Sequence, residues 1–177
     1  MWRECDVKIY PGKIRDKELR KAYEKGMVGK YTMDVGWERS YTIYNVYGES
    51  GGTNDNITTT EALLQGCIRD RRTGVCNPTM WVGDFNAEPN KLGPVQELIK
   101  EERWTDVGHR ARWWGQPADH WTCHQRHDAK KPRIDGIVVD SETLGTIHNF
   151  EVENQTFFPT HNTLRLELSR NAFKGRV

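Results

Sequence analysis

The sequence predicts one folded domain of mixed structure, of the α/β or α+β class. Its 177 residues suit a single hydrophobic core, which is comfortable at about 100 to 200 residues. Segments typical of strands and of amphipathic helices follow one another along the chain. Leu, Ile, Val and Phe make up only about a fifth of the residues, close to the level of disordered proteins. The net charge of +1, with seven Trp and six Tyr to bury, still predicts a folded domain with a lean aliphatic core.

The first elements predicted are a helix and a β-hairpin. Residues 13–25 are charged and favour a solvated helix, and Gly26 suits the position just after it. Two runs rich in β-forming residues follow, 31–35 and 40–47, and the turn between them, 36–39, contains Gly.

The middle of the chain predicts two helices around a buried strand. Thr58 and Glu61 stand three apart ahead of apolar residues, which predicts a capping box and a helix that ends near Arg72. Residues 79–83 are a short apolar run typical of a strand buried on both faces. Residues 94–102 begin with Pro and place apolar residues on one face, which predicts the second helix.

The last third of the chain predicts strands. Residues 133–139 are rich in Ile and Val, and residues 146–152 and 162–168 follow, the last with Leu at alternate positions. About six strands interleaved with two or three helices are therefore expected.

Composition also narrows the setting and the partners. No apolar stretch approaches the roughly 18 residues of a membrane span, and no signal-peptide pattern begins the chain, so a soluble, intracellular protein is expected. The charge balance excludes bulk attraction to nucleic acid but leaves room for local basic patches. The cysteines lack CxxC spacing, which predicts neither a disulfide framework nor a cysteine zinc site; they are Cys5, Cys67, Cys76 and Cys123.

The chemistry-bearing segment is the end of the buried strand. Asp84 and Asn86 are two residues apart and so point the same way, and Gly83 leaves room for a ligand. A carboxylate there can orient or deprotonate a water, and an amide can donate to a phosphate oxygen. This pattern suits a phosphate site.

Residues 83–86 (GDFN) resemble the GDFN motif of the endonuclease/exonuclease/phosphatase superfamily, whose members share a DNase I-like sandwich of two β-sheets flanked by helices. Further resemblances occur in the family's order: residues 43–48 (IYNVYG) to its "xNVYG" strand end, 98–107 to its "LL…GWTDA" passage, 133–138 (RIDGIV) to its "RIDYIL" strand, and 159–161 (PTH) to its "SDH". These matches span about residues 30–168.

The resemblance implies a role for each matched residue in metal-dependent phosphodiester hydrolysis. Asp84 would orient or activate the attacking water, and Asn86 would stabilise the pentavalent phosphorane. His161 would hold the scissile phosphate, with Asp135 fixing its tautomer. Tyr47 would contact the phosphate or the leaving oxygen. The family uses Mg²⁺ or Mn²⁺, because a divalent ion screens the phosphate and stabilises the departing alkoxide.

The chain departs from the family pattern in its carboxylates. Ser50 stands where the nuclease branch often has Asn, as a shorter substrate-binding group, and Thr160 replaces a metal-binding Asp. The metal-binding Glu of the family's "QE" strand is not found, which leaves Asp84 and Asn86 as the candidate metal ligands.

The same comparison predicts how the chain is organised. Residues 1–29 are expected to be a divergent N-terminal segment, 30–170 a partial domain of this fold, incomplete at its N-terminus, and 171–177 a tail. A complete domain of the family needs about 250 residues, near the upper range for one core.

Two clusters outside the motifs have alternative readings. Residues 110–114 interleave Arg and Trp, so Arg112 and Trp113 can grip nucleic acid through phosphate contacts and base stacking, or the loop can simply pack its own rings. A second cluster has the spacing of zinc ligands, although a hairpin loop is the better prediction; it comprises His120, Cys123, His124 and His127.

Endonuclease-type cleavage of nucleic acid, similar to that of retroelement endonucleases, is the leading functional hypothesis. One alternative is a catalytically inactive scaffold that binds nucleic acid or a partner, which the missing carboxylates favour. The other is a phosphodiesterase acting on a lipid or an inositol phosphate, because the site would treat these phosphodiesters in a similar way.

Overall fold

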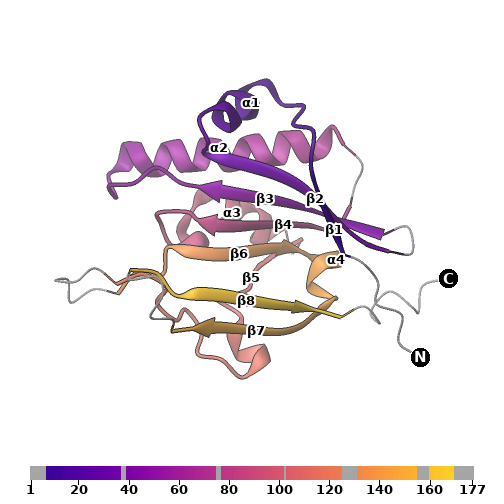
Figure 1. Ribbon diagram of the computed structural model, residues 1–177. Coiled ribbons are helices and arrows are strands. Elements are labelled where there is room, and N and C mark those ends of the chain that lie inside the picture. The colour runs from indigo at the N-terminus through magenta and orange to yellow at the C-terminus, as the bar shows by residue number, and fades with distance from the viewer. Residues whose placement is uncertain are drawn as a thin grey trace.

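The computed structural model describes residues 7–36, 39–74, 77–101, 103–124, 131–154 and 160–169. Within these ranges the strands form two sheets, a mixed sheet with the order β1-β2-β3-β4-β6-β5 and an antiparallel β7-β8 pair (Figure 1). The strands of the larger sheet are β1 (Lys8–Pro11), β2 (Val28–Gly36), β3 (Arg39–Tyr47), β4 (Thr79–Asp84), β5 (Trp104–Asp106) and β6 (Asp135–Asp140). The smaller sheet consists of β7 (Ile147–Glu153) and β8 (Thr163–Leu168).

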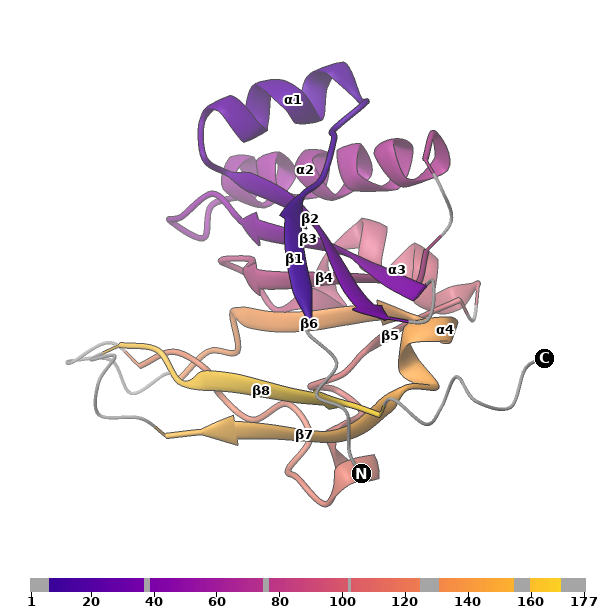
Figure 2. The ribbon, with the colours of Figure 1, turned by 45° about the vertical axis from the view of Figure 1, so that its right-hand side comes forward.

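The helices are α1 (Lys17–Glu24), α2 (Asn54–Arg72), α3 (Gly93–Lys100), α4 (Ser141–Leu144) and the 3₁₀ turns η1 (Pro89–Lys91) and η2 (Ala111–Trp114). The first two lie at the opposite end of the molecule from the β7-β8 pair, whereas η2 packs against β7 (Figures 1 and 2). None of these helices is both long and apolar enough to cross a membrane.

The observed elements confirm the predicted mixed class and most of the predicted segments. The start of α2 is different: Thr53, not Thr58, caps the helix, because its hydroxyl accepts from the Asn56 backbone N–H at 3.3 Å. The Thr58 hydroxyl instead donates to the Asn54 carbonyl one turn back, at 2.9 Å. Three further elements, β1, β5 and α4, were not predicted.

The larger sheet separates two hydrophobic cores. Side chains alternate along a strand, so Tyr44 and Trp81 pack against the helices while Tyr41 and Met80 face the smaller sheet. The second core also includes Phe150 of β7. The predicted two-sheet sandwich is therefore present, but its second layer has two strands in the described part of the chain.

This narrow second layer leaves one apolar face partly covered. Met33, Ile43 and Val82 of the larger sheet are only partly buried. They line a groove of about 450 Å³ together with residues of β8, including Leu164 and Leu166. The half-covered face accounts for part of the lean aliphatic composition, because fewer large apolar side chains are needed where one layer is thin.

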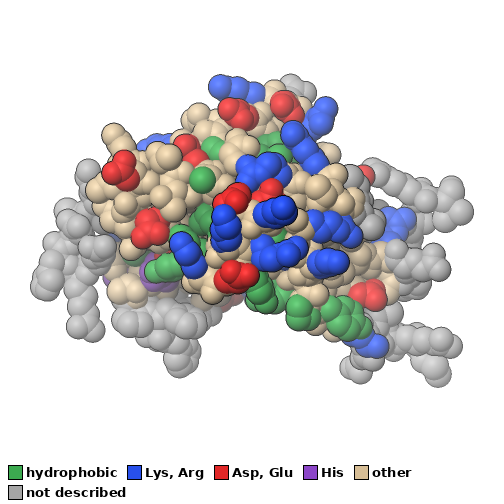
Figure 3. All heavy atoms as spheres, turned by 90° about the horizontal axis from the view of Figure 1, so that it is seen from above, with side chains coloured by type: hydrophobic (Ala, Val, Ile, Leu, Met, Phe, Trp, Pro, Cys, Tyr) green, Lys and Arg blue, Asp and Glu red, His purple; other side chains and the backbone are tan. Residues whose placement is uncertain are grey.

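A buried carboxylate joins the N-terminal elements to the sheet. Asp70 of α2 accepts from Lys30 Nζ at 2.6 Å, from the Tyr44 hydroxyl at 2.8 Å and from the Asp16 backbone N–H at 3.0 Å. Burial raises the pKa of this carboxyl, but these hydrogen bonds outweigh burial and hold the pKa below its ordinary value. Lys and Arg gather on the same face, over α1 and α2 (Figure 3). Within α1 and α2, Lys21 pairs with Glu18 and Arg69 with Asp16.

Candidate active site

The site is built where three neighbouring strands of the larger sheet meet at one edge. Tyr47 ends β3 and Asp84 ends β4, and these two residues are paired in the parallel register. Asp84 is also paired with Asp135, the first residue of β6. Paired residues of neighbouring strands project from the same face, so these three side chains form a row across the strand ends.

Gly83 allows β3 and β4 to approach closely at this row. Its φ of +133° is a conformation that side chains rarely adopt. A Cβ atom there would lie 2.2 Å from the Val46 carbonyl oxygen and 2.9 Å from Asn45 Oδ1. The glycine predicted to leave room for a ligand is thus needed first for the strand contact that positions Asp84.

His161 joins the row from the segment that leads into β8. It forms an isolated β-bridge with Cys123, and its Nδ1 lies 2.9 Å from Asp135 Oδ2. An ionised carboxylate can only accept, so this contact places the proton on Nδ1 and leaves Nε2 free for a substrate. The Thr122 hydroxyl accepts from the Asp135 backbone N–H at 2.9 Å and fixes the start of β6.

Asp84, Asp135 and His161 each offer a ligand atom, and these atoms lie within 4.8 Å of one another. Burial raises the pKa of Asp84, and the Asp135 carboxylate raises it further. A hydrogen bond from the Asn86 backbone N–H opposes this rise, as does His161. Two carboxylates held this close favour a cation between them.

Asn86 fastens the loop after β3 to the end of β4. Its Nδ2 donates to the Gly48 carbonyl at 2.8 Å, and the Gly48 N–H donates to the Asp84 carbonyl at 2.7 Å. The Asn86 backbone has a φ of 51° and donates to Asp84 Oδ1 at 2.8 Å. The same loop carries Ser50, whose backbone carbonyl accepts from Asn56 Nδ2.

The structure thus brings together Tyr47, Asp84, Asp135 and His161 from distant parts of the sequence. Tyr47 is 55% exposed, so its hydroxyl is accessible to a substrate. Sequence reasoning missed Asn45, which lies two residues before Tyr47 on the same face and lines the groove with Asp84 and Asp135. The sequence feature that could have identified Asn45 is its position as a polar residue within the β-forming run of β3.

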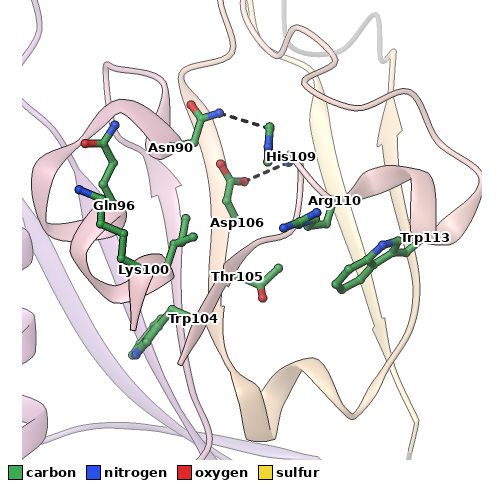
Figure 4. Close-up of a pocket in the computed structure, with 10 residues that line it drawn as sticks. Asn90, Gln96, Lys100, Trp104, Thr105, Asp106, His109, Arg110 and Trp113 are labelled. Atoms are coloured by element: carbon green, nitrogen blue, oxygen red, sulfur yellow. Dashed lines mark hydrogen bonds between the residues drawn. The ribbon is translucent and has the colours of Figure 1, made fainter. Parts of the chain in front are cut away.

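Other predicted residues lie apart from this row. Arg112 and Trp113 belong to η2, and Trp113 lines a separate pocket with Arg110, whose guanidinium stacks on the indole (Figure 4). Arg133 pairs with Asp106, which leaves Asp135 to His161. Within the described ranges the zinc-like cluster gathers no metal-binding group, and His127 lies outside those ranges.

Comparison with solved structures identifies the fold. The 3′ phosphatase NExo from Neisseria, bound to a product DNA hairpin, matches 93% of this chain and 72% of its own, with 15% identity and a TM-score of 0.61. An AP endonuclease from Archaeoglobus fulgidus matches 92% and 70%, with 13% identity and a TM-score of 0.59. The endonuclease domain of TRAS1, a telomere-specific non-LTR retrotransposon, matches 94% and 69%, with 13% identity and a TM-score of 0.60.

Comparison with protein-family models and with curated protein sequences gave no match. The structural matches nevertheless cover most of the chain, and all three of these proteins have longer chains than this one. The chain therefore shares its fold with these proteins and with a solved structure described as an endonuclease/exonuclease/phosphatase from Beutenbergia cavernae, and it spans about 70% of the length of the first three.

Proposed function

We propose that this protein hydrolyses phosphodiester bonds of nucleic acid with the help of Mg²⁺ or Mn²⁺. The observation that carries the proposal is the gathering of Asp84, Asp135 and His161 at one edge of the sheet. Carboxylate and imidazole groups in such a cluster can bind a divalent ion, a phosphate and a water at once.

The position of each group supports its proposed role. His161 is oriented by Asp135 at 2.9 Å, so that its Nε2, when it also carries a proton, donates a hydrogen bond to the scissile phosphate. Asp84, partly desolvated at the end of β4, orients the water and accepts its proton. The Asn86 side chain retains one amide hydrogen after its bond to Gly48, and it stabilises charge on the phosphate oxygens. Tyr47 and Ser50 contact the phosphate from the β3 side.

The donor set fits a divalent ion. Asp84 and Asp135 provide carboxylate oxygens, which suit both Mg²⁺ and Mn²⁺, and His161 lies beside them to hold the phosphate. The Asn86 amide oxygen, which accepts no hydrogen bond from a described residue, is a further candidate ligand. When bound, the ion screens the phosphate and stabilises the departing oxygen.

Nucleic acid is the preferred substrate class on two grounds. Matched structures include a phosphatase bound to a DNA hairpin and a retrotransposon endonuclease domain. In addition, exposed Arg110 and Trp113 offer charge and stacking beyond the strand ends.

Nicking of supercoiled plasmid DNA in Mg²⁺ or Mn²⁺ tests the proposal. The wild-type protein is expected to convert supercoiled to relaxed DNA, and Asp84→Asn to reduce the rate by about 100-fold or more. Asp55→Asn, an exposed change in the first turn of α2, should cleave normally. Failure of the wild type to cleave, or equal cleavage by Asp84→Asn, would refute the proposal.

A second candidate is a nuclease-like scaffold that binds nucleic acid without cleaving it. It is favoured by the small number of metal-binding side chains. Thr160 stands before His161 in place of a metal-binding Asp, and the group found in the described chain has only three members. DNA binding in EDTA with no cleavage in either metal would support this candidate instead.

A further inference from the structure

A hollow on the surface lies away from the row of site residues. It has a volume of about 620 Å³ and lies between α3 and η2, beside β5, the edge strand of the larger sheet (Figure 4). Pockets that bind small molecules or nucleotide-sized groups usually fall in the range of about 300 to 1,000 Å³. The space is therefore sufficient for one nucleotide.

An exposed aromatic ring forms one wall of this pocket. The Trp113 side chain is 59% exposed, and the Arg110 guanidinium lies 5.4 Å from its ring centroid. Figure 4 shows both residues on the η2 side of the pocket. An accessible indole with a neighbouring cation is suited to stack a planar base and to attract its phosphate.

The charges left free in the pocket are positive. Arg110 and Lys100 form no ion pair with a described residue. The acidic lining residue Asp106 is neutralised by the buried Arg133, at 3.0 and 2.7 Å. His109 is paired with Asp119 at 2.8 Å, outside the lining. The pocket therefore favours an anionic ligand.

Polar groups without a partner complete the lining. The side-chain amide of Gln96 and the hydroxyl of Thr105 make no hydrogen bond with a described residue, and both residues line the pocket. Asn90 Oδ1 is buried and has no hydrogen-bond partner there. A buried unpaired acceptor is costly, so a ligand donor at this position would stabilise the site.

We infer that this pocket binds one nucleotide of a nucleic-acid strand, with the base stacked on Trp113 and the phosphate between Arg110 and Lys100. The inference rests on the proposed function for its setting. Asp106 pairs with Val138, which lies three residues, about 10 Å, along β6 from Asp135. At about 3.4 Å per stacked nucleotide this spacing corresponds to about three nucleotides, so the pocket would hold a nucleotide a few positions from the scissile phosphate.

Fluorescence anisotropy with a labelled ten-nucleotide deoxyadenylate in EDTA tests the pocket without any cleavage. Trp113→Ala is expected to weaken binding by about 10-fold or more, and Trp113→Phe to restore most of it. Arg110→Gln should lower the slope of log affinity against log salt by about 0.7. The matched controls are Tyr10→Ala, an exposed aromatic of β1, and Arg72→Gln, an exposed cation of α2; both should bind as wild type.

A backbone of the same length without bases separates stacking from charge. The wild-type protein should bind it about 10-fold more weakly than the deoxyadenylate, and Trp113→Ala should abolish this preference. Unchanged binding by Trp113→Ala and Arg110→Gln overturns the inference, even where the protein nicks plasmid DNA. Loss of binding in both variants supports the pocket, even where the protein nicks nothing and the proposed function fails.

Discussion

Replacement of Asp106 by Ala tests the buried ion pair that precedes β6. Asp106 accepts two hydrogen bonds from Arg133, at 3.0 and 2.7 Å, and their side chains are 1% and 5% exposed. Arg133 has a second acidic neighbour, Asp119, at 3.1 Å, but that side chain is 43% exposed. One guanidinium thus has a buried and an exposed partner, which makes a matched comparison.

The expected loss in the free energy of unfolding depends on how deeply the pair is buried. Removal of one partner of a buried pair costs about 3–5 kcal/mol, because the remaining charge is left without compensation. Asp119 stays near the guanidinium in Asp106→Ala, so we expect the lower half of that range, about 3–4 kcal/mol. Asp119→Asn removes only the charge of a half-exposed partner and keeps a residue type that tolerates the φ of 55° there, so it should cost about 0–1 kcal/mol. At about 2–4 °C per kcal/mol, Asp106→Ala should lower the Tm by roughly 6–16 °C.

Urea unfolding followed by circular dichroism measures both variants, with an unchanged m-value as the check on comparable unfolding. The double variant Asp106→Leu/Arg133→Met removes both charges and should recover stability relative to Asp106→Ala. A loss below 1 kcal/mol in Asp106→Ala, or an equal loss in Asp119→Asn, would show that burial does not set the strength of this pair.

Three further predictions concern the frame of the site. The pKa of Asp70 is lowered in the folded protein, so its carboxylate contributes fully to stability at a pH above its ordinary pKa of 3.8. This contribution is lost as the pH falls through the lowered pKa of the folded protein. In acid unfolding titrations, Asp70→Asn should lose this pH dependence. Gly83→Ala would place a Cβ atom 2.2 Å from the Val46 carbonyl oxygen. It should therefore lower the free energy of unfolding by more than Gly115→Ala, which has a φ of +75° but open space around it and should cost about 1–2 kcal/mol. Equal losses in the two variants would contradict the close contact at Gly83. Burial raises the pKa of the Cys67 thiol, so iodoacetamide should label it only after unfolding, and mass spectrometry of the native protein would detect any earlier reaction.

Sequence patterns predicted the longer elements because their hydrophobic periodicity is local. The run that became β4 is apolar, and the first three residues of that strand are buried. β5 was missed because three residues show no period, and β1 because all four of its residues are exposed. The true cap of α2, Thr53, lies five residues before the predicted capping box, since several threonines there compete as cap candidates.

The site was predictable where a motif carried it. Resemblance placed Asp84, Asp135 and His161 together, and the structure brings their ligand atoms within 4.8 Å. The pairing of Arg133 with Asp106 depends on a contact 27 residues apart, which no local pattern encodes. The position of Arg110, rather than Arg112, over the Trp113 ring depends on the 3₁₀ turn η2, whose geometry was not predicted.

Binding of one divalent ion by Asp84 and Asp135, beside His161, can be measured without knowledge of the substrate. Electron paramagnetic resonance of free Mn²⁺ during titration with protein gives the number of bound ions and their affinity. We predict one ion per chain, with an affinity reduced about 10-fold or more in Asp84→Asn and in Asp135→Asn, and unchanged in Asp55→Asn. Absence of bound Mn²⁺, or equal affinity in all the variants, would contradict a metal site at Asp84 and Asp135.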